Sequence, residues 1–158
     1  MFYYTMLEEL KMRIQDYKSV EKHLTKLGAK FSHEVYCIDT HFKTPTNQVI
    51  KIENDPSGNY FIELKLKNGK FQILKNEKIE NIKKIKEELT KEYEIKRVIP
   101  KQRRFFHFKN YQIQVCIVEN LGEFLIIEGE NLAPEVIIKE LKIKNPEFVT
   151  VSFDQLMR

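Results

Sequence analysis

The sequence predicts an α+β domain: an antiparallel eight-stranded β-barrel, closed or nearly closed, with helices packed outside it. Three observations lead to this fold class. About eight segments alternate apolar and polar residues, most of them are joined by short turns, and three further segments have helical periodicity. Strands and helices do not alternate as a parallel sheet requires. The chain of 158 residues has the length of one domain, so we expect a single domain over residues 1–158.

The N-terminal segment is predicted to be a strand from Phe2 to Ile14, because aromatic residues in its first half suit a pleated strand. Apolar residues then recur at positions 17, 20, 24 and 27. Together with Asp16 as N-cap and Gly28 after the last turn, this spacing predicts a helix over residues 17–27.

Hairpins dominate the middle of the chain. Residues 30–42 alternate and end at the turn TPTN, the runs 48–54 and 60–67 are joined by DPSG, and NGK at 68–70 forms the next turn. Apolar residues at helical spacing predict a second helix over 78–93. The remaining segments are three strands over 96–108, 111–119 and 123–130, a helix over 134–143 with proline in its first turn, and an ambiguous end, 149–158.

The composition is that of a folded protein and says little about partners. Charged residues make up 32% and apolar residues 42%, and the formal net charge of +4 favours anionic partners. The basic residues are dispersed, so nucleic-acid binding is not signalled. Cys37 and Cys116 lie far apart without a CxxC partner, which favours a cytoplasmic setting. No segment has the length of apolar residues that a membrane span needs, and we expect a monomer or a homodimer.

Charged residues recur on one face of strand after strand. They are Glu9, Lys11 and Arg13, then Lys51 and Glu53, then Glu63, Lys65 and Lys67, then Lys101 and Arg103, and finally Glu128. For any single strand, such a face suits the solvated outer surface of a sheet. If the apolar faces pack under the helices, the charged faces line the barrel lumen or open to water. Such a lumen repels itself unless a polyanion fills it, with bases on phosphate oxygens and glutamates on a divalent cation.

Several motifs, in this order, resemble the CYTH superfamily, the triphosphate tunnel metalloenzymes that include class IV adenylyl cyclases and thiamine triphosphatases. LEELKMRI resembles the N-terminal ExExK strand, and YCIDTHFKTP is similar to the DTYFDTP segment. VIKIEN resembles the LRIR strand, IELKLK the strand with the tunnel lysine, and PKQRRFFHF the basic strand KxRxxY. IVENLGEFLIIE resembles EVEGLGxFxEIE, and VSFDQL resembles SYxxLL. The resemblance covers nearly the whole chain.

The resemblance implies a triphosphate tunnel and assigns residues to it, although it identifies no catalytic residue. Glu9 and Glu128 correspond to metal-binding carboxylates. The bases implied to bind triphosphate are Lys11, Lys51, Lys65 and Arg103, with Lys101 as a weaker member. The implied cofactor is Mg2+ or Mn2+, which so few carboxylates hold weakly. The implied partner is a triphosphate-containing small molecule or polyphosphate.

The chain departs from the family's pattern at four positions. Leu7 and Ile126 stand where the two ExE pairs have a further carboxylate, Cys116 replaces an acid, and Glu53 replaces the second arginine of LRIR. We expect Leu7 and Ile126 to lie inside the lumen at the vacated ends of these pairs, where their side chains cover each other. Glu130 offers a displaced carboxylate on the same strand face as the remaining glutamate of the second pair.

These features leave three hypotheses for the function. The first is a divalent-metal-dependent enzyme, a phosphohydrolase or a class IV adenylyl cyclase-like protein, that acts on a nucleoside, thiamine or inorganic triphosphate. The alternative is a catalytically impaired CYTH-like module that binds polyphosphate or nucleotides without turnover and with little metal dependence. The third is a structural domain with an emptied tunnel.

Other residues have simpler interpretations. His23, His33, His41 and His107 lack metal-ligand spacing, and surface or packing roles are expected for them. Cys116 is expected to be a buried, inert thiol. The run FFHF is expected to belong to the core, although Phe105 offers a stacking surface for an adenine or a thiazole if it faces the lumen. The sequence contains no glycine-rich phosphate loop.

Overall fold

The computed structural model describes residues 7–45 and 47–157, so residues 2–6 of the predicted first strand lie outside the described residues. The strands in these ranges are β1 (Leu7–Ile14), β2 (Lys30–Phe42), β3 (Gln48–Asp55), β4 (Gly58–Lys67), β5 (Lys70–Ile79), β6 (Ile95–Phe108), β7 (Tyr111–Val118), β8 (Gly122–Glu130) and β9 (Glu147–Phe148). The helices are α1 (Tyr17–Leu27), α2 (Ile82–Glu92), α3 (Pro134–Leu141) and α4 (Phe153–Leu156). None of the described helices is long and apolar enough to cross a membrane.

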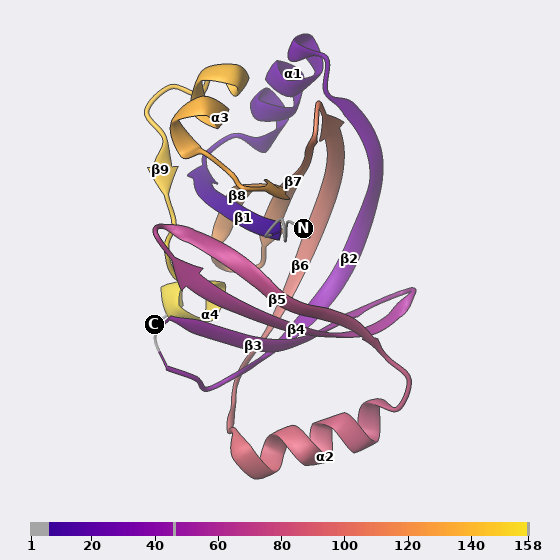
Figure 1. Cartoon of the computed structure of the whole chain (residues 1–158). Coiled ribbons are helices and arrows are strands. Elements are labelled where there is room, and N and C mark those ends of the chain that lie inside the picture. The colour runs from indigo at the N-terminus through magenta and orange to yellow at the C-terminus, as the bar shows by residue number, and fades with distance from the viewer. Residues whose placement is uncertain (1–6, 46, 158) are drawn as a thin grey trace, which may run out of the picture.

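Eight strands close into an antiparallel barrel, and the predicted fold class is confirmed. The strands follow the order β5-β4-β3-β2-β6-β7-β8-β1, and a further pairing between β1 and β5 closes the ring. The two-residue strand β9 is an addition to β1. β2 and β6 are the longest strands, with 13 and 14 residues, and they curve from the half of the barrel near α1 to the half near α2 (Figure 1).

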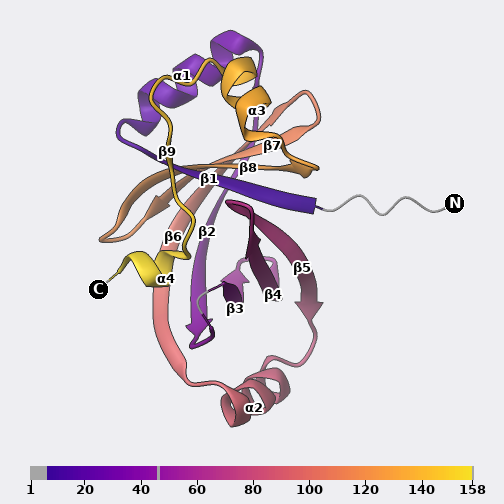
Figure 2. The same cartoon turned by 60° about the vertical axis from the view of Figure 1, so that its left-hand side comes forward.

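Of the described helices, α1 and α3 cover one side of the barrel, and α2 covers the opposite side (Figures 1 and 2). α1 and α3 lie over β1, β7 and β8, where Leu10 and Met12 pack with Leu24 of α1 and Ile137 of α3. α2 lies under β3 and β4 and contacts a cluster that includes Ile52. As predicted, the apolar faces of β1 and β3 are therefore covered by helices, and their charged faces point into the barrel.

The local signals for α1 act as the sequence predicts. Asp16 accepts hydrogen bonds from the backbone N–H and the hydroxyl group of Ser19. Gly28 ends the helix with φ of 104°, a left-handed conformation that glycine adopts without steric cost. These two caps fix where the chain leaves β1 and where it enters β2.

The predicted start of the second helix differs from the structure. The second helix begins at Ile82 and not at residue 78, because Asn81 caps it by accepting a hydrogen bond from the backbone N–H of Lys84. The preceding Lys78 and Ile79 extend β5 and pair with β4. The ambiguous C-terminal segment contains the short helix α4, which lies beside one end of the barrel (Figure 2).

The prediction for β4 is wrong. We expected Ile62 and Leu64 to pack under helices and Lys65 to point into the lumen. Instead Ile62 and Leu64 are buried with Phe71 of β5 inside the barrel, and Lys65 is exposed on the outer face. The alternation shows which residues share a face of a strand, but it does not show which face is inside.

The core under α1 and α3 generates the first prediction. Leu10 is 1% exposed, and replacing it with alanine removes apolar contacts and leaves a cavity. We expect Leu10→Ala to lower the free energy of unfolding by about 2–5 kcal/mol, measured by urea denaturation. Leu74→Ala is the control, because Leu74 is 44% exposed on β5 and its loss should change stability by less than about 0.5 kcal/mol. Equal effects of both substitutions would contradict this account of the core.

Candidate functional site

A cavity of about 170 Å³ lies inside the barrel and brings together most of the predicted site residues. Its charged lining residues come from β1, β3, β6 and β8, and they are Glu9, Lys11, Lys51, Glu53, Asp55, Lys101, Arg103 and Glu128. Six of the seven residues that the family resemblance assigned therefore meet in one place. The seventh, Lys65, is not among the residues that line the cavity. Bases and carboxylates are mixed in the lining, so negative charges accompany its positive charges.

Leu7 and Ile126, which stand where the two ExE pairs have a further carboxylate, are not neighbours. Ile126 lines the cavity, as expected, and pairs across the strands with Lys11. Leu7 is 39% exposed at the end of β1 and pairs with Glu130, which is itself exposed. The expectation that Leu7 and Ile126 cover each other inside the lumen is therefore wrong, because the antiparallel register separates them by four residues along β8.

Buried ion pairs occupy the middle of the cavity wall. The carboxylate of Asp39, which is fully buried, accepts from Lys51 at 2.9 Å and pairs with Lys101 at 2.6 Å. Glu53 pairs with Lys101 at 3.5 Å and accepts a hydrogen bond from Arg103. Two carboxylates and three bases thus form one connected group that joins β2, β3 and β6. Sequence reasoning placed Glu53 on this face but did not identify Asp39 as a charge partner.

The pKa values in this group reflect the pairing. Burial alone would raise the pKa of Asp39, but the ammonium groups of Lys101 and Lys51 outweigh burial and hold it well below its usual range. The pKa of Glu53 is lowered for the same reason by Lys101 and Arg103. Burial would lower the pKa of Lys101, and the two carboxylates raise it instead. Asp39, Glu53 and Lys101 therefore stay charged at neutral pH.

Glu9 and Glu128 form a second, different arrangement. They lie directly opposite each other on β1 and β8, and both side chains line the cavity. Burial, and to a smaller extent the neighbouring charge of Glu9, raise the pKa of Glu128 to about 7, while Arg103 opposes the shift. Two carboxylates that repel each other in a cavity are a suitable oxygen donor set for a divalent cation such as Mg2+ or Mn2+.

Lys11 lies beside this pair and differs from the other bases. Its ammonium group sits 4.0 Å from the ring centroid of Phe153 and 4.7 Å from that of Phe71. Burial lowers the pKa of Lys11 to about 8, although Glu9 partly offsets the effect. Within the described ranges, Lys11 has no carboxylate at salt-bridge distance. It is therefore the lining base whose charge is least neutralised.

The short helix α4 covers one end of the cavity, a role that the sequence pattern did not reveal. Phe153 and Ser152 belong to the cavity lining. Asp154 holds the segment in place through Lys96 at 3.0 Å and through the Nδ1 atom of His41 at 3.3 Å. His41 is thus a buried packing residue between the barrel wall and the C-terminal segment.

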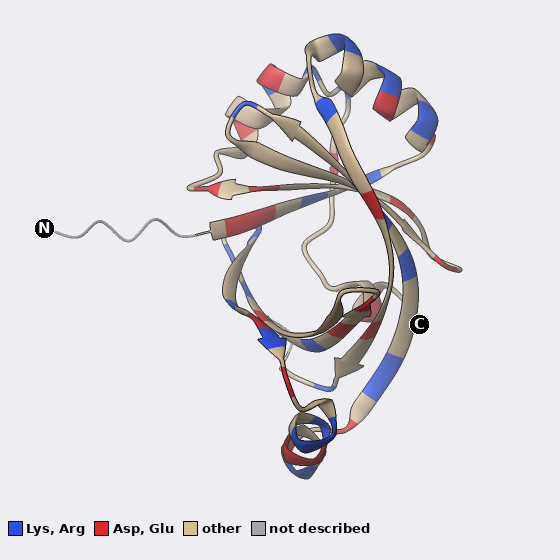
Figure 3. Cartoon of the chain, turned by 90° about the vertical axis from the view of Figure 1, so that its right-hand side faces the viewer, with Lys and Arg blue, Asp and Glu red and all other residues tan. Residues whose placement is uncertain are grey.

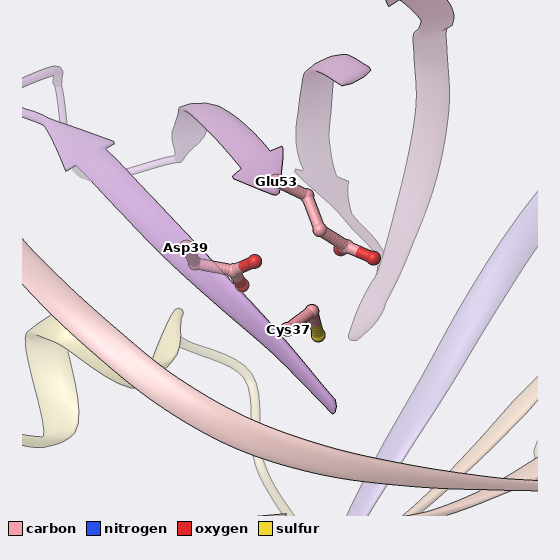
Figure 4. Close-up of side chains that lie close together, drawn as sticks. All are labelled: Cys37, Asp39 and Glu53. Carbon is pink, nitrogen blue, oxygen red and sulfur yellow. The ribbon is translucent and has the colours of Figure 1, made fainter. Parts of the chain in front are cut away.

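Cys37, Asp39 and Glu53 lie close together on β2 and β3 (Figure 4). One potential ligand atom of each lies within 4.8 Å of the others, which is close enough for a metal ion. However, the two carboxylates already pair with Lys51, Lys101 and Arg103. Burial also raises the pKa of Cys37 to about 12, so its thiol is protonated. The charge of this group is better balanced by its bases than by a cation.

The remaining candidates have structural surroundings. Cys116 is fully buried and its pKa is raised by burial, as expected for an inert thiol. Phe105 is buried, stacks on His33 with ring centroids 4.5 Å apart, and contacts the guanidinium group of Arg103. Because neighbouring groups already cover this ring, the structure gives no open stacking surface at Phe105.

Comparisons with known proteins identify the fold. No protein-family model matches the sequence, and no curated protein matches it. The chain resembles the structure of PH1012 from Pyrococcus horikoshii OT3, with a TM-score of 0.83, 20% identity, and coverage of 97% of this chain and 100% of that chain. It also resembles a proposed adenylate cyclase from Vibrio parahaemolyticus, with a TM-score of 0.76, 12% identity and coverage of 98% and 99%.

A third similar structure is that of HpAC1 from Hippeastrum, a proposed adenylyl cyclase described as having a dominant triphosphatase activity. Its TM-score is 0.67, its identity 15%, and the match covers 97% of this chain and 95% of that chain. The chain therefore has the barrel fold of CYTH-type proteins, and the resemblance inferred from its motifs is confirmed at the level of the fold.

The ion-pair group generates the second prediction. Lys101→Met leaves Asp39 and Glu53 with one fewer cation in a buried environment. We expect the free energy of unfolding to fall by about 3–5 kcal/mol in urea denaturation. Lys65→Met, the same substitution on the outer face, should change it by less than about 0.5 kcal/mol. A stable Lys101→Met protein would show that these carboxylates do not need the lysine.

The raised pKa of Glu128 generates the third prediction. A carboxyl group whose pKa is higher in the folded state binds its proton more tightly there, so it favours folding at low pH and loses this effect as the pH rises through about 7. Relative to Glu128→Gln, the natural chain should lose on the order of 1 kcal/mol of stability between pH 5 and pH 8, after allowance for partial exposure. Urea denaturation at both pH values measures this difference.

Glu130→Gln is the control for this measurement, because Glu130 is exposed two residues further along the same strand. It should follow the natural chain at both pH values. If Glu128→Gln also follows the natural chain, Glu128 is solvated and does not feel the charge of Glu9.

Proposed function

We propose that the barrel binds the triphosphate group of a small molecule as a complex with a divalent cation, Mg2+ or Mn2+. The observation that carries this proposal is the placement of Glu9 directly opposite Glu128 in a cavity that also contains Lys11 and Arg103. Oxygen ligands for a hard cation and donors for phosphate oxygens thus face the same space. The fold shared with CYTH-type proteins supports this assignment.

The charge balance of the cavity favours binding with a metal over binding without one. Its bases are Lys11, Lys51, Lys101 and Arg103, whereas Glu9, Glu53, Asp55 and Glu128 line the same space and Asp39 lies buried in the wall. A triphosphate entering alone therefore meets at least as many carboxylates as bases. The alternative of a polyphosphate-binding module with little metal dependence is less well supported.

Each group of the cavity has a distinct task in this proposal. Glu9 and Glu128 hold the cation, which when bound neutralises phosphate oxygens and aligns them. Lys11, with no carboxylate partner among the described residues, donates to the phosphate chain. Phe153 closes one end of the cavity, so the organic part of the ligand extends toward the other end. We expect this binding to take place in the cytoplasm.

Hydrolysis of the bound triphosphate is the second candidate function. The observation in its favour is the shared cavity of Glu9, Glu128 and Lys11, in which a cation held by the two carboxylates would polarise the phosphate and Lys11 would offset its negative charge. The loss of carboxylates at Leu7, Cys116 and Ile126 argues for slow turnover, because fewer charges hold the cation. Adenylyl cyclase activity would use the same site as hydrolysis and would differ from it in the product, a cyclic nucleotide.

Binding generates the fourth prediction. We expect Mn2+ and tripolyphosphate together to bind the natural chain, and Lys11→Ala to weaken this binding by about tenfold or more, because the charge-assisted hydrogen bond from the base without a carboxylate partner among the described residues is lost. Isothermal titration calorimetry measures the affinity. Lys65→Ala is the control and should bind like the natural chain, since Lys65 lies outside the cavity. No binding by the natural chain would overturn the proposed function.

Turnover is tested separately, with ATP, thiamine triphosphate and tripolyphosphate as substrates and Mg2+ or Mn2+ present. Release of phosphate, pyrophosphate or a cyclic nucleotide distinguishes hydrolysis from cyclisation. Activity that disappears in Glu9→Ala would establish the enzyme function. Activity equal in both proteins would exclude this site as its source.

A further inference from the structure

We propose that Glu53 is a specificity-determining residue that makes the tunnel accept a phosphate chain carried with a divalent cation and exclude the same chain without one. This inference rests on the proposed function and names the ligand class of the same site. It follows from the ion pairs that Glu53 forms with Lys101 and Arg103, two bases of the cavity. It does not follow from a general need of phosphate binding for a metal.

Glu53 acts as an anion that is built into the binding site. Its side chain lines the cavity and is 3% exposed. One carboxylate oxygen accepts a hydrogen bond from the Nη1 atom of Arg103, and the other lies 3.5 Å from the ammonium group of Lys101. The Nε atom of Arg103 is also used, because it donates to Gln114 at 3.0 Å. A phosphate group that approaches Arg103 must therefore compete with a carboxylate already bound there.

Asp39 neutralises bases of the cavity from inside the barrel wall. It is fully buried, does not line the cavity, and pairs with Lys51 and Lys101. Three of the four lining bases thus have carboxylate partners, and Lys11 is the exception among the described residues. A polyanion that enters without a metal is therefore attracted by the ammonium group of Lys11, whose charge no carboxylate partner among the described residues neutralises. It is repelled by several carboxylates.

A divalent cation reverses this balance. Bound between Glu9 and Glu128, it adds two positive charges on the opposite wall from Glu53, so phosphate oxygens gain attraction without displacing Glu53 from Arg103. Glu53 is the determinant, and Asp39 is not, because Glu53 reaches the cavity that the ligand enters. Its position on β3 also corresponds to the second arginine of the LRIR pattern, so this chain has exchanged a base for an acid there.

The test compares tripolyphosphate binding with and without Mg2+ in the natural chain and in Glu53→Gln, by isothermal titration calorimetry. The metal-free samples contain a chelator. Glu53→Gln keeps the size of the side chain and removes its charge, which frees Arg103 for phosphate. We expect the natural chain to bind the magnesium complex at least about 100-fold more tightly than the free anion, and Glu53→Gln to raise metal-free affinity by about tenfold or more.

Glu63→Gln is the matched control, because it removes the same charge from the outer face of β4. It should leave both affinities unchanged. Thermal unfolding of each protein verifies that it is folded, and Glu53→Ala replaces Glu53→Gln in the comparison if the glutamine variant lacks a cooperative transition.

The outcomes separate this inference from the proposed function. Failure of the natural chain to bind tripolyphosphate even with Mg2+ overturns both. If the natural chain prefers the magnesium complex, but removing the charge of Glu53 leaves metal-free affinity at the level of Glu63→Gln or lowers it, the inference alone is overturned. In that case Glu53 positions Arg103 and does not exclude free anions.

Discussion

The buried ion pairs of Asp39 and Glu53 with their three bases are the interaction on which the rest of this structure depends. An eight-stranded barrel has an interior that side chains nearly fill, so charges inside it must be paired at close range. The acids come from β2 and β3 and the bases from β3 and β6. Asp39 therefore links β2 to its neighbours β3 and β6, and Glu53 links β3 to β6 across β2. The same contacts stabilise the barrel and determine how much charge remains available for a ligand. Lys11, Glu9 and Glu128 line the same cavity and lie outside this group.

This arrangement changes how the basic lumen is interpreted. Charged residues on one face of successive strands suggested an interior that needs a polyanion to be stable. Acidic and basic residues both occur along the strands of the barrel (Figure 3), and both kinds line the cavity. The chain supplies its own counter-charges, so the barrel does not require a ligand in order to fold. The positions where the sequence departs from the family's pattern, above all Glu53, therefore matter as much as those that agree with it.

Most of the fold, and the position of six of the seven assigned residues in one cavity wall, could be predicted from the sequence, because strand alternation, turn signals and capping residues are local. The errors concern information that is not local. Lys65 and Ile62 alternate equally well in either orientation of β4, and only the closed sheet places the isoleucine inside. Asp39 became a charge partner because β2 passes beside β3 and β6, and Phe153 reached the cavity because the C-terminal segment folds back to the barrel. Such contacts between distant segments leave no periodic signal in the sequence.

The central claim is that a divalent cation binds between Glu9 and Glu128. The carboxylates of Asp39 and Glu53, which lie beside Cys37, pair with bases and do not bind the cation. Crystals grown with Mn2+ and tripolyphosphate test it most directly, because the anomalous signal of manganese locates the ion without assumptions about its ligands. The account predicts an anomalous peak within coordination distance of the Glu9 and Glu128 carboxylates, with phosphate density that contacts Lys11. A peak at Cys37, Asp39 and Glu53, with Lys101 displaced from its carboxylates, would contradict it.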